Sequence, residues 1–161
     1  MKTFLRRAFL VLAVLFVAIQ LVPYGRGEVD PPVTKEPTWD SPRTRELAVR
    51  ACFDCHSRTP VRPWYSHVAP ISWLVQHDIE EGREHLDFTA WDQPQRDAHE
   101  AAETIEEGEM PPELYLPLHP EAQLSAAEKS ELMNGLNASL ADAIRPQRRG
   151  PPRSERERDD D

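Results

Sequence analysis

Residues 51–57 read ACFDCHS and contain the only two cysteines of a 161-residue chain. Cys52 and Cys55 are separated by two residues, and His56 directly follows the second cysteine. Three kinds of chemistry use such a run: a dithiol redox switch, half of a metal site, or covalent attachment of haem. Each of them needs a different surrounding fold, so the remaining sequence can distinguish between them.

The N-terminus has the features of an export signal. Lys2, Arg6 and Arg7 precede residues 8–22, AFLVLAVLFVAIQLV, which carry no charge. No convincing small-residue cleavage site follows, and a cleaved signal peptide is the alternative interpretation. We therefore predict a signal anchor or transmembrane helix within residues 1–24, with its basic end in the cytoplasm.

This topology predicts a single-pass protein of the inner (cytoplasmic) membrane whose domain lies in the periplasm, an oxidising compartment. Residues 25–40 are rich in proline and are predicted to form a stiff linker. Residues 41–143 are expected to form the folded domain that contains the cysteine motif, and residues 144–161 are expected to be a disordered charged tail. The formal net charge of −9 argues against nucleic acid as a partner, because phosphate contacts need clustered Lys and Arg.

Apolar residues inside the domain recur at the spacing of α-helices. Ser41 followed by Pro42 is typical of a helix start, and Ser125 begins a capping-box pattern. Asp92 is the expected cap of another helix, which ends at Gly108. No segment alternates convincingly with a period of two, so we predict an all-α domain of four to five short helices. The first expected helix begins at Ser41. The other expected helices lie in residues 69–86, 92–108 and 125–140.

The surroundings of Cys52 disfavour two of the three chemistries. A thioredoxin-like dithiol needs a preceding strand and a βαβ unit, but the segment before Cys52 has a helical pattern. A zinc site needs four ligands, usually from two paired motifs, and the chain has one C-x-x-C. A disulfide between Cys52 and Cys55 would close a very short loop, would stabilise little, and would leave His56 unexplained.

Haem c is the chemistry that the motif fits best. Two thiols one helical turn apart can bond to the two vinyl groups of one haem, and His56 is then the proximal axial ligand of the iron. The export signal agrees with this hypothesis, because haem c is attached outside the cytoplasm. A domain of this size with few large apolar residues often needs a cofactor to complete its core.

Met110 is the favoured second axial ligand. It lies in EEGEMPPELY, between a helix-ending glycine and two prolines, where a rigid loop can present a thioether to iron. Met133 lies inside the last expected helix and fits the core better. His67 and His119 are rival ligands in loops. The other histidines lie on polar faces: His77, His85 and His99.

The segments PWYS, AP-SWL, EGR-HL-F and GEMPP…LHPEA-LS follow the C-x-x-C-H motif in this order. Together they resemble the bacterial haem-binding domain family of small c-type cytochrome-like proteins over residues 40–140. The resemblance implies a cytochrome c-like bundle around one covalent haem, held by Cys52 and Cys55, with His56 as an axial ligand. It also implies that Met110 faces the iron. The segment DFTAW departs from the usual pattern and affects only local packing.

Large aromatic side chains are candidate walls of the cofactor pocket. Trp64, Tyr65 and Trp73 lie in the family segments, and Trp91 follows them. Their flat rings suit a haem face, although core packing is the more ordinary role of any one of them.

The leading hypothesis is a membrane-anchored periplasmic cytochrome with one haem, which carries single electrons and is not an enzyme. Its redox partner is unidentified. Residues 97–113 contain seven carboxylates and neither Lys nor Arg, so they could steer a basic partner, although a solvated helix face is the simpler interpretation. One alternative is a haem-based sensor or peroxidase-like enzyme with an open sixth position. Another is an accessory module that needs haem to fold.

Overall fold

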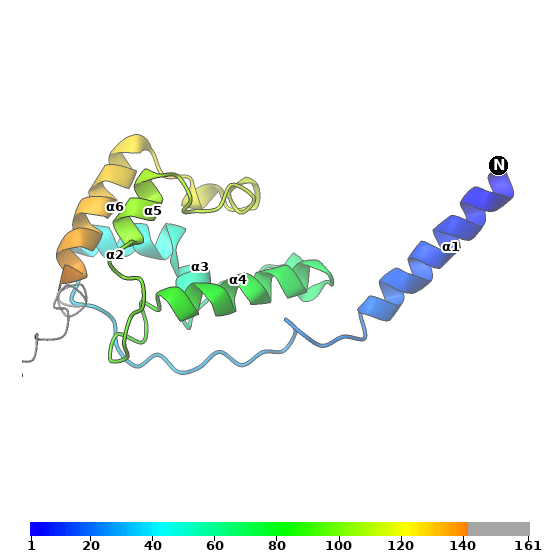
Figure 1. Cartoon of the computed structure of the whole chain (residues 1–161), viewed down its shortest axis with the longest axis horizontal. Helices are drawn as coiled ribbons and strands as arrows, with labels where there is room; N and C mark the ends of the chain where they lie inside the picture. Colours follow the sequence, from blue (N-terminus) through cyan, green and yellow to red (C-terminus); the bar gives the residue numbers. More distant parts are fainter. Residues whose placement is uncertain (142–161) are drawn as a thin grey trace, which may run out of the picture.

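A computed structural model describes residues 1–141 of the chain. The regular secondary structure of these residues is helical, with no strand among them. This confirms the all-α prediction. A single isolated bridge joins Lys35 and Ala90. Figure 1 shows a cluster of short helices with α1 projecting from it. The α-helices are α1 (Lys2–Ile19), α2 (Pro42–Ala51), α3 (Phe53–His56), α4 (Ile71–His85), α5 (Ala101–Glu106) and α6 (Ala126–Ser139). The 3-10 turns are η1 (Trp64–His67), η2 (Leu116–Leu118) and η3 (Pro120–Ala122).

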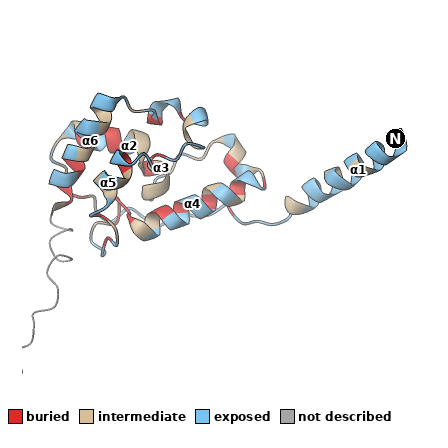
Figure 2. Ribbon diagram, turned by 45° about the horizontal axis from the view of Figure 1, so that its top comes forward, coloured by how far each residue is buried: buried red, intermediate tan, exposed pale blue. Residues whose placement is uncertain are grey.

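The apolar core lies where α2, α5 and α6 meet, close to α3. Leu132 and Leu136 on α6 are fully buried against Leu47 of α2. Gly135 lets the two helices approach closely, because a Cβ there would lie 2.1 Å from Oγ1 of Thr44. Figure 2 shows the buried residues gathered between these helices and along one side of α4. This core supports the segment that carries the two cysteines.

Helix starts were predicted well where a side chain caps the backbone. The Ser41 hydroxyl accepts a hydrogen bond from the Thr44 amide at 3.1 Å, with Pro42 as the first helical residue. At α6, Ser125 and Glu128 cap each other's backbone amides in the expected capping box. The predictions at Ser41 and Ser125 are confirmed.

The predicted helix over residues 92–108 is wrong in its first half, because α5 begins only at Ala101. Asp92 does not cap a helix, and its carboxylate instead accepts a hydrogen bond from the Thr34 hydroxyl. The Gln95 side chain accepts from the Asp87 amide at 2.8 Å and donates to the Ala90 carbonyl at 2.9 Å. These contacts hold the residues before α5 against the loop that precedes them. A helix starting at Asp92 would not allow Gln95 to make these contacts.

Helix α1 stands apart from the domain and buries none of its residues (Figure 1). It contains Lys2, Arg6 and Arg7 within its 18 residues. In the part of the chain that the structure describes, no helix has both the length and the apolar character needed to cross a membrane. The membrane helix predicted within residues 1–24 is therefore not supported by the fold.

The chain after α1 docks on the start of α4. The Gln20 amide donates to the Ala69 carbonyl at 2.9 Å and accepts from the Ala69 amide at 3.0 Å. Gly25 has φ = 75°, and a Cβ there would lie 2.1 Å from the Ser72 carbonyl oxygen. Glycine is thus required at residue 25 both by the backbone conformation and by the contact.

The proline-rich segment lies along the domain, where the sequence predicts a linker. Asp30 accepts hydrogen bonds from Arg83 at 2.7 Å and from Arg62 at 2.9 Å. Burial opposes ionisation of Asp30, but the two guanidinium groups outweigh it and lower the pKa. Trp39 then packs against the core. The tail predicted over residues 144–161 lies outside the described residues.

Candidate functional site

The cysteine motif lies at a break between two helices. Helix α2 ends at Ala51, Cys52 departs from helical geometry at φ = −127° and ψ = −34°, and α3 begins at Phe53. The Cys52 carbonyl accepts hydrogen bonds from the Cys55 amide at 3.2 Å and the His56 amide at 2.9 Å. This single turn places Cys52, Cys55 and His56 within one short, hydrogen-bonded unit.

Both cysteines are half-buried free thiols, so the disulfide alternative is not formed. Burial is the main cause that raises the pKa of Cys52 to about 12 and that of Cys55 to about 11. Both sulfurs therefore stay protonated at neutral pH. A reactive dithiol needs the opposite environment, one that lowers the thiol pKa.

The imidazole of His56 is held by the backbone of a distant segment. Its Nδ1 donates to the Leu86 carbonyl oxygen across 3.0 Å, and the His56 carbonyl accepts from the Phe88 amide at 2.9 Å. Burial lowers the pKa of His56, which favours the neutral ring. With Nδ1 used as a donor, Nε2 keeps a lone pair for a metal.

Helix α4 lies directly against the motif because Gly82 has no side chain. A Cβ at Gly82 would lie 2.8 Å from the Cys55 carbonyl oxygen. One helical turn earlier, the charge of the Asp78 carboxylate adds to the effect of burial in raising the pKa of the Cys55 thiol. The apolar residues Ile71 and Leu74 continue this side of α4 and are 46% and 54% exposed. The helix therefore offers an apolar face beside the cysteines.

A polar cluster joins the motif to the segment between α5 and α6. The Tyr115 hydroxyl donates to the Asp54 carboxylate at 2.6 Å, and the Val61 amide donates to the same carboxylate at 2.9 Å. The Tyr115 ring stacks on His119 with centroids 3.8 Å apart. Nε2 of His119 and the Tyr65 hydroxyl are 2.6 Å apart. Burial, followed by the Asp54 contact, raises the pKa of Tyr115 well above its ordinary value.

Met110 lies half-buried at the start of that same segment. The amides of Glu109 and Met110 both donate to the Thr104 carbonyl, at 2.9 Å and 3.1 Å, so α5 fixes its backbone. Met110 and Cys52 pack against one apolar cluster, whereas Met110 has no hydrogen bond or ring contact with His56 among the described residues. Met133 also packs against this cluster, in agreement with its expected place in the core.

The structure separates the candidate aromatic residues. Trp64 is 78% exposed and packs edge-on against Tyr65 at 5.9 Å. Nε1 of Trp73 is buried and finds no hydrogen-bond partner within residues 1–141. Trp91 packs against the core, as does Trp39, which the sequence analysis did not single out. Of the four aromatic candidates, only Trp91 packs against the cluster that Cys52 also contacts, and Trp64, Tyr65 and Trp73 are not part of it.

The rival histidine ligands have other contacts or other locations. His119 is buried and bonded to Tyr65, and its Nδ1 lies 3.2 Å from the Glu121 carboxylate. His67 ends the η1 turn. The remaining three each lie beside a carboxylate: His77 beside Glu81, His85 beside Asp97 and His99 beside Glu100.

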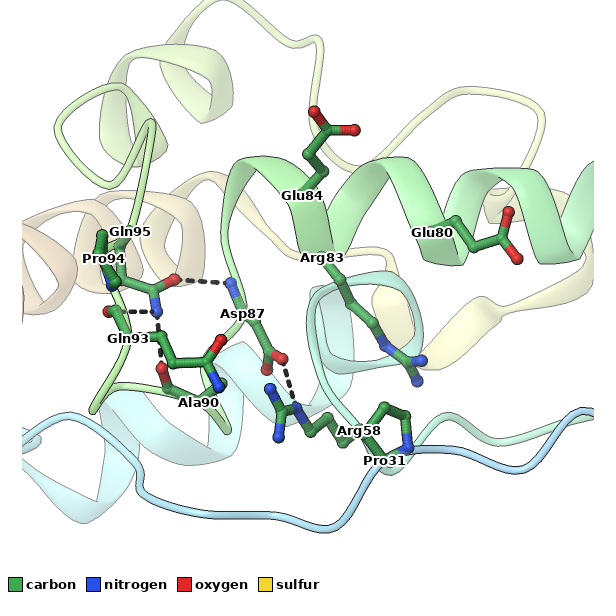
Figure 3. A pocket seen from close by; sticks show the side chains of 10 residues that line it. All are labelled: Pro31, Arg58, Glu80, Arg83, Glu84, Asp87, Ala90, Gln93, Pro94 and Gln95. Carbon is green, nitrogen blue, oxygen red and sulfur yellow. Dashed lines mark hydrogen bonds and ion pairs between the residues drawn. The ribbon is translucent and has the colours of Figure 1, made fainter.

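A polar pocket lies on a different side of α4, between the proline-rich segment and the loop after the helix (Figure 3). Within it the Arg58 guanidinium pairs with the Asp87 carboxylate at 2.9 Å, and both side chains are largely buried. Its lining contains neither cysteine, nor His56, nor Met110. The pocket is therefore separate from the motif. Its Arg58–Asp87 ion pair stabilises the loop that supplies the Leu86 carbonyl.

Sequence reasoning missed the groups that hold the motif in place. The Leu86 carbonyl has no sequence signal, because any residue supplies a carbonyl. Asp54 lies between the two cysteines, where residue identity is unrestricted in the motif. Tyr115 and His119 stand inside the family-like segment GEMPP…LHPEA-LS, and their position there was the available signal.

The donor set fits a covalently attached haem. Two protonated thiols one turn apart suit addition to vinyl groups, and the neutral imidazole beside them has Nδ1 anchored and Nε2 available. The all-α fold and this site are those expected of a small helical protein in which two thiols and an imidazole would hold a prosthetic group.

Comparison with known proteins identifies the family within this class. The chain belongs to the haem-binding domain family, whose model matches residues 14–138. The match includes the proline-rich segment, which agrees with its contacts along the domain. Searches of curated proteins and of solved structures returned no match. The protein is therefore a haem-binding domain protein.

Proposed function

We propose that the protein is a c-type cytochrome with one covalent haem and that it carries single electrons outside the cytoplasm. The observation that supports this most directly is the state of His56. Its ring is fixed by the Leu86 carbonyl at 3.0 Å, so Nε2 remains for iron beside two half-buried thiols. Such a second-shell hydrogen bond fixes the orientation and basicity of a metal-binding imidazole.

Cys52 and Cys55 would hold the haem through thioether bonds. Each cysteine would supply its S–H to one vinyl C=C bond, with sulfur bonded to one carbon and hydrogen to the other, so that no external oxidant or reductant is needed. His56 would bind the iron through Nε2. The bound group supplies a one-electron couple, while the protein orients it and limits its access to water.

Met110 is the proposed distal ligand. Its backbone is fixed by the Thr104 carbonyl, so the side chain starts from a defined position next to the cluster that contacts Cys52. A thioether ligand in addition to the imidazole would raise the reduction potential of the haem and keep other ligands from the iron. Both properties suit an electron carrier better than a ligand-binding enzyme.

The proposed location is the periplasm, with an unidentified redox protein as partner. The basic residues followed by the apolar run of residues 8–22 support export. Separation of a host that attaches haem c into periplasmic and membrane fractions tests this. Recovery of the haem-loaded chain in the cytoplasm alone would contradict it, and the membrane fraction reports whether the N-terminal segment holds the domain at the membrane.

The decisive experiment compares optical spectra of the exported full chain with those of Met110→Ala and a matched control, Met133→Ala. We expect wild type and the control to be low-spin and to bind carbon monoxide only slowly, and Met110→Ala to become high-spin and bind it rapidly. A wild-type protein that is already high-spin and binds carbon monoxide rapidly would instead support a haem-based sensor or peroxidase-like enzyme. A chain without covalent haem would overturn the proposal.

A further inference from the structure

We propose that Tyr115 is a positioning residue that holds residues 109–119 against the haem-attachment motif and thereby controls access to the distal side of the iron. This inference rests on the proposed function. The segment carries Met110 at its start, and Tyr115 contacts Asp54 between the two cysteines. The hydrogen bond thus joins residues 109–119, here called the distal segment, directly to the part of the chain that would carry the haem.

Residues 109–119 have little apolar packing to hold them. Only Pro111 and His119 are buried in this stretch, while Leu114 is 88% exposed and Leu118 64% exposed. In Figure 1 the segment extends on the same side of the domain as α4. Its position must therefore depend on polar contacts far more than the position of α6 does.

Two such contacts fix the far end of the segment. Tyr115 donates to Asp54 at 2.6 Å, a short bond to a carboxylate, which is among the stronger kinds of hydrogen bond. His119 accepts from the Tyr65 hydroxyl at 2.6 Å when its Nδ1–H donates to Glu121. The stacked rings of Tyr115 and His119 make the two contacts one unit.

Exposed apolar side chains lie next to these contacts. Leu114 and Leu118 flank the polar cluster on the segment, and Ile71 and Leu74 lie on the side of α4 that continues from Cys55. When the Tyr115 bond is lost, the segment keeps its anchor at Thr104 and can move away at its far end. Exogenous ligands would then reach the iron more easily.

The test uses the haem-loaded full chain with Tyr115→Phe, which keeps the ring and removes only the hydroxyl. Tyr24→Phe is the matched control, because the Tyr24 hydroxyl also donates to a carboxylate, that of Glu80 at 2.8 Å, away from the motif. We measure the rate of carbon monoxide association with the reduced protein, the spin state, and haem content. We expect the association rate of Tyr115→Phe to rise roughly tenfold, at equal haem content, as the loss of one bond to a charged acceptor implies.

Equal rates in wild type, Tyr24→Phe and Tyr115→Phe would overturn the inference. Should Tyr115→Phe fail to retain haem, Tyr65→Phe decides, because it removes the second contact of the same segment and should raise the rate by a smaller factor. An unchanged rate in Tyr65→Phe would then count against the inference. Failure of the proposed function looks different: wild type would lack covalent haem, or Met110→Ala would leave its spectrum unaltered.

Discussion

Helices α4 and α6 have nearly the same length, 15 and 14 residues, yet they are held to the domain in different ways. Helix α6 buries Leu132 and Leu136 in the apolar core. The buried residues of α4 are mainly small or polar, with Ile79 as the one large apolar residue among them, while Ile71 and Leu74 remain exposed. The α6 half of the domain is closed by its own apolar side chains, whereas the α4 half leaves apolar side chains exposed, next to the cysteines of the proposed haem site.

The largest effect is expected where a buried ion pair supports the α4 half. Asp87→Ala removes the partner of Arg58 and two hydrogen bonds to Thr89, and should lower the free energy of unfolding by about 3–5 kcal/mol. Chemical denaturation of the full chain measures it. Asp92→Ala, an exposed carboxylate bonded to one threonine, is the control and should cost much less. Equal losses would show that the pair does not stabilise this half.

The next effect separates the two helices directly. Leu136→Ala should destabilise the chain by about 2–5 kcal/mol with or without haem, because it opens a cavity in the core. Leu74→Ala should leave the thermal midpoint of the haem-free chain unchanged and lower that of the haem-loaded chain. Thermal unfolding of both forms measures this. If Leu74→Ala behaved alike in both forms, haem would not cover this face of α4.

Two glycines give a smaller and matched comparison. A Cβ at Gly135 meets Thr44, and a Cβ at Gly82 meets the backbone of Cys55. Either alanine substitution should cost about 1–3 kcal/mol by overpacking. Gly82→Ala should in addition reduce covalent haem content, because it forces α4 away from the motif. Haem staining of the exported protein checks this, and normal staining of Gly82→Ala would contradict it.

The smallest effect concerns the cap of α6 and depends on pH. The Ser125 backbone amide, followed by Arg50, lowers the pKa of Glu128 to about 2 from an ordinary value of 4.5. Stability from this carboxylate is thus fully present above pH 4.5 and is lost as pH falls towards 2. Glu128→Gln should flatten the pH dependence of the thermal midpoint in that window. Glu106→Gln, an exposed carboxylate on α5, controls for loss of charge, and a profile of Glu128→Gln identical to wild type would refute the prediction.

Local signals made the fold partly predictable. Side-chain caps at Ser41 and Ser125 act over three residues, so the sequence contains all of the information needed to place these helix starts. The helix predicted from Asp92 was wrong because Gln95 bonds to the loop after α4, and such a contact is set by the tertiary fold. The same reason explains the proline-rich segment, whose course depends on Arg62 and Arg83 more than on its own prolines.

Haem binding was predictable from the sequence and agrees with the family of the chain, whereas the support of the candidate site was not predictable. The spacing of Cys52, Cys55 and His56 predicts the attachment chemistry, and the roles of these three residues stay predictions. The groups that hold His56 and the distal segment are a backbone carbonyl and a set of ordinary polar residues. Their roles arise only when α4, the η1 turn and the segment after α5 are brought together in space.

The docking of Gln20 and Gly25 on the start of α4 has a consequence for the search for a partner. Because Gln20 bonds to both backbone groups of Ala69, the chain leaves the domain at one fixed point and direction. Whatever holds the N-terminal segment thus also limits the rotation of the domain. An immobilised domain with one allowed orientation samples a smaller volume than one on a flexible tether, so its effective concentration is high towards partners on one side and low towards all others.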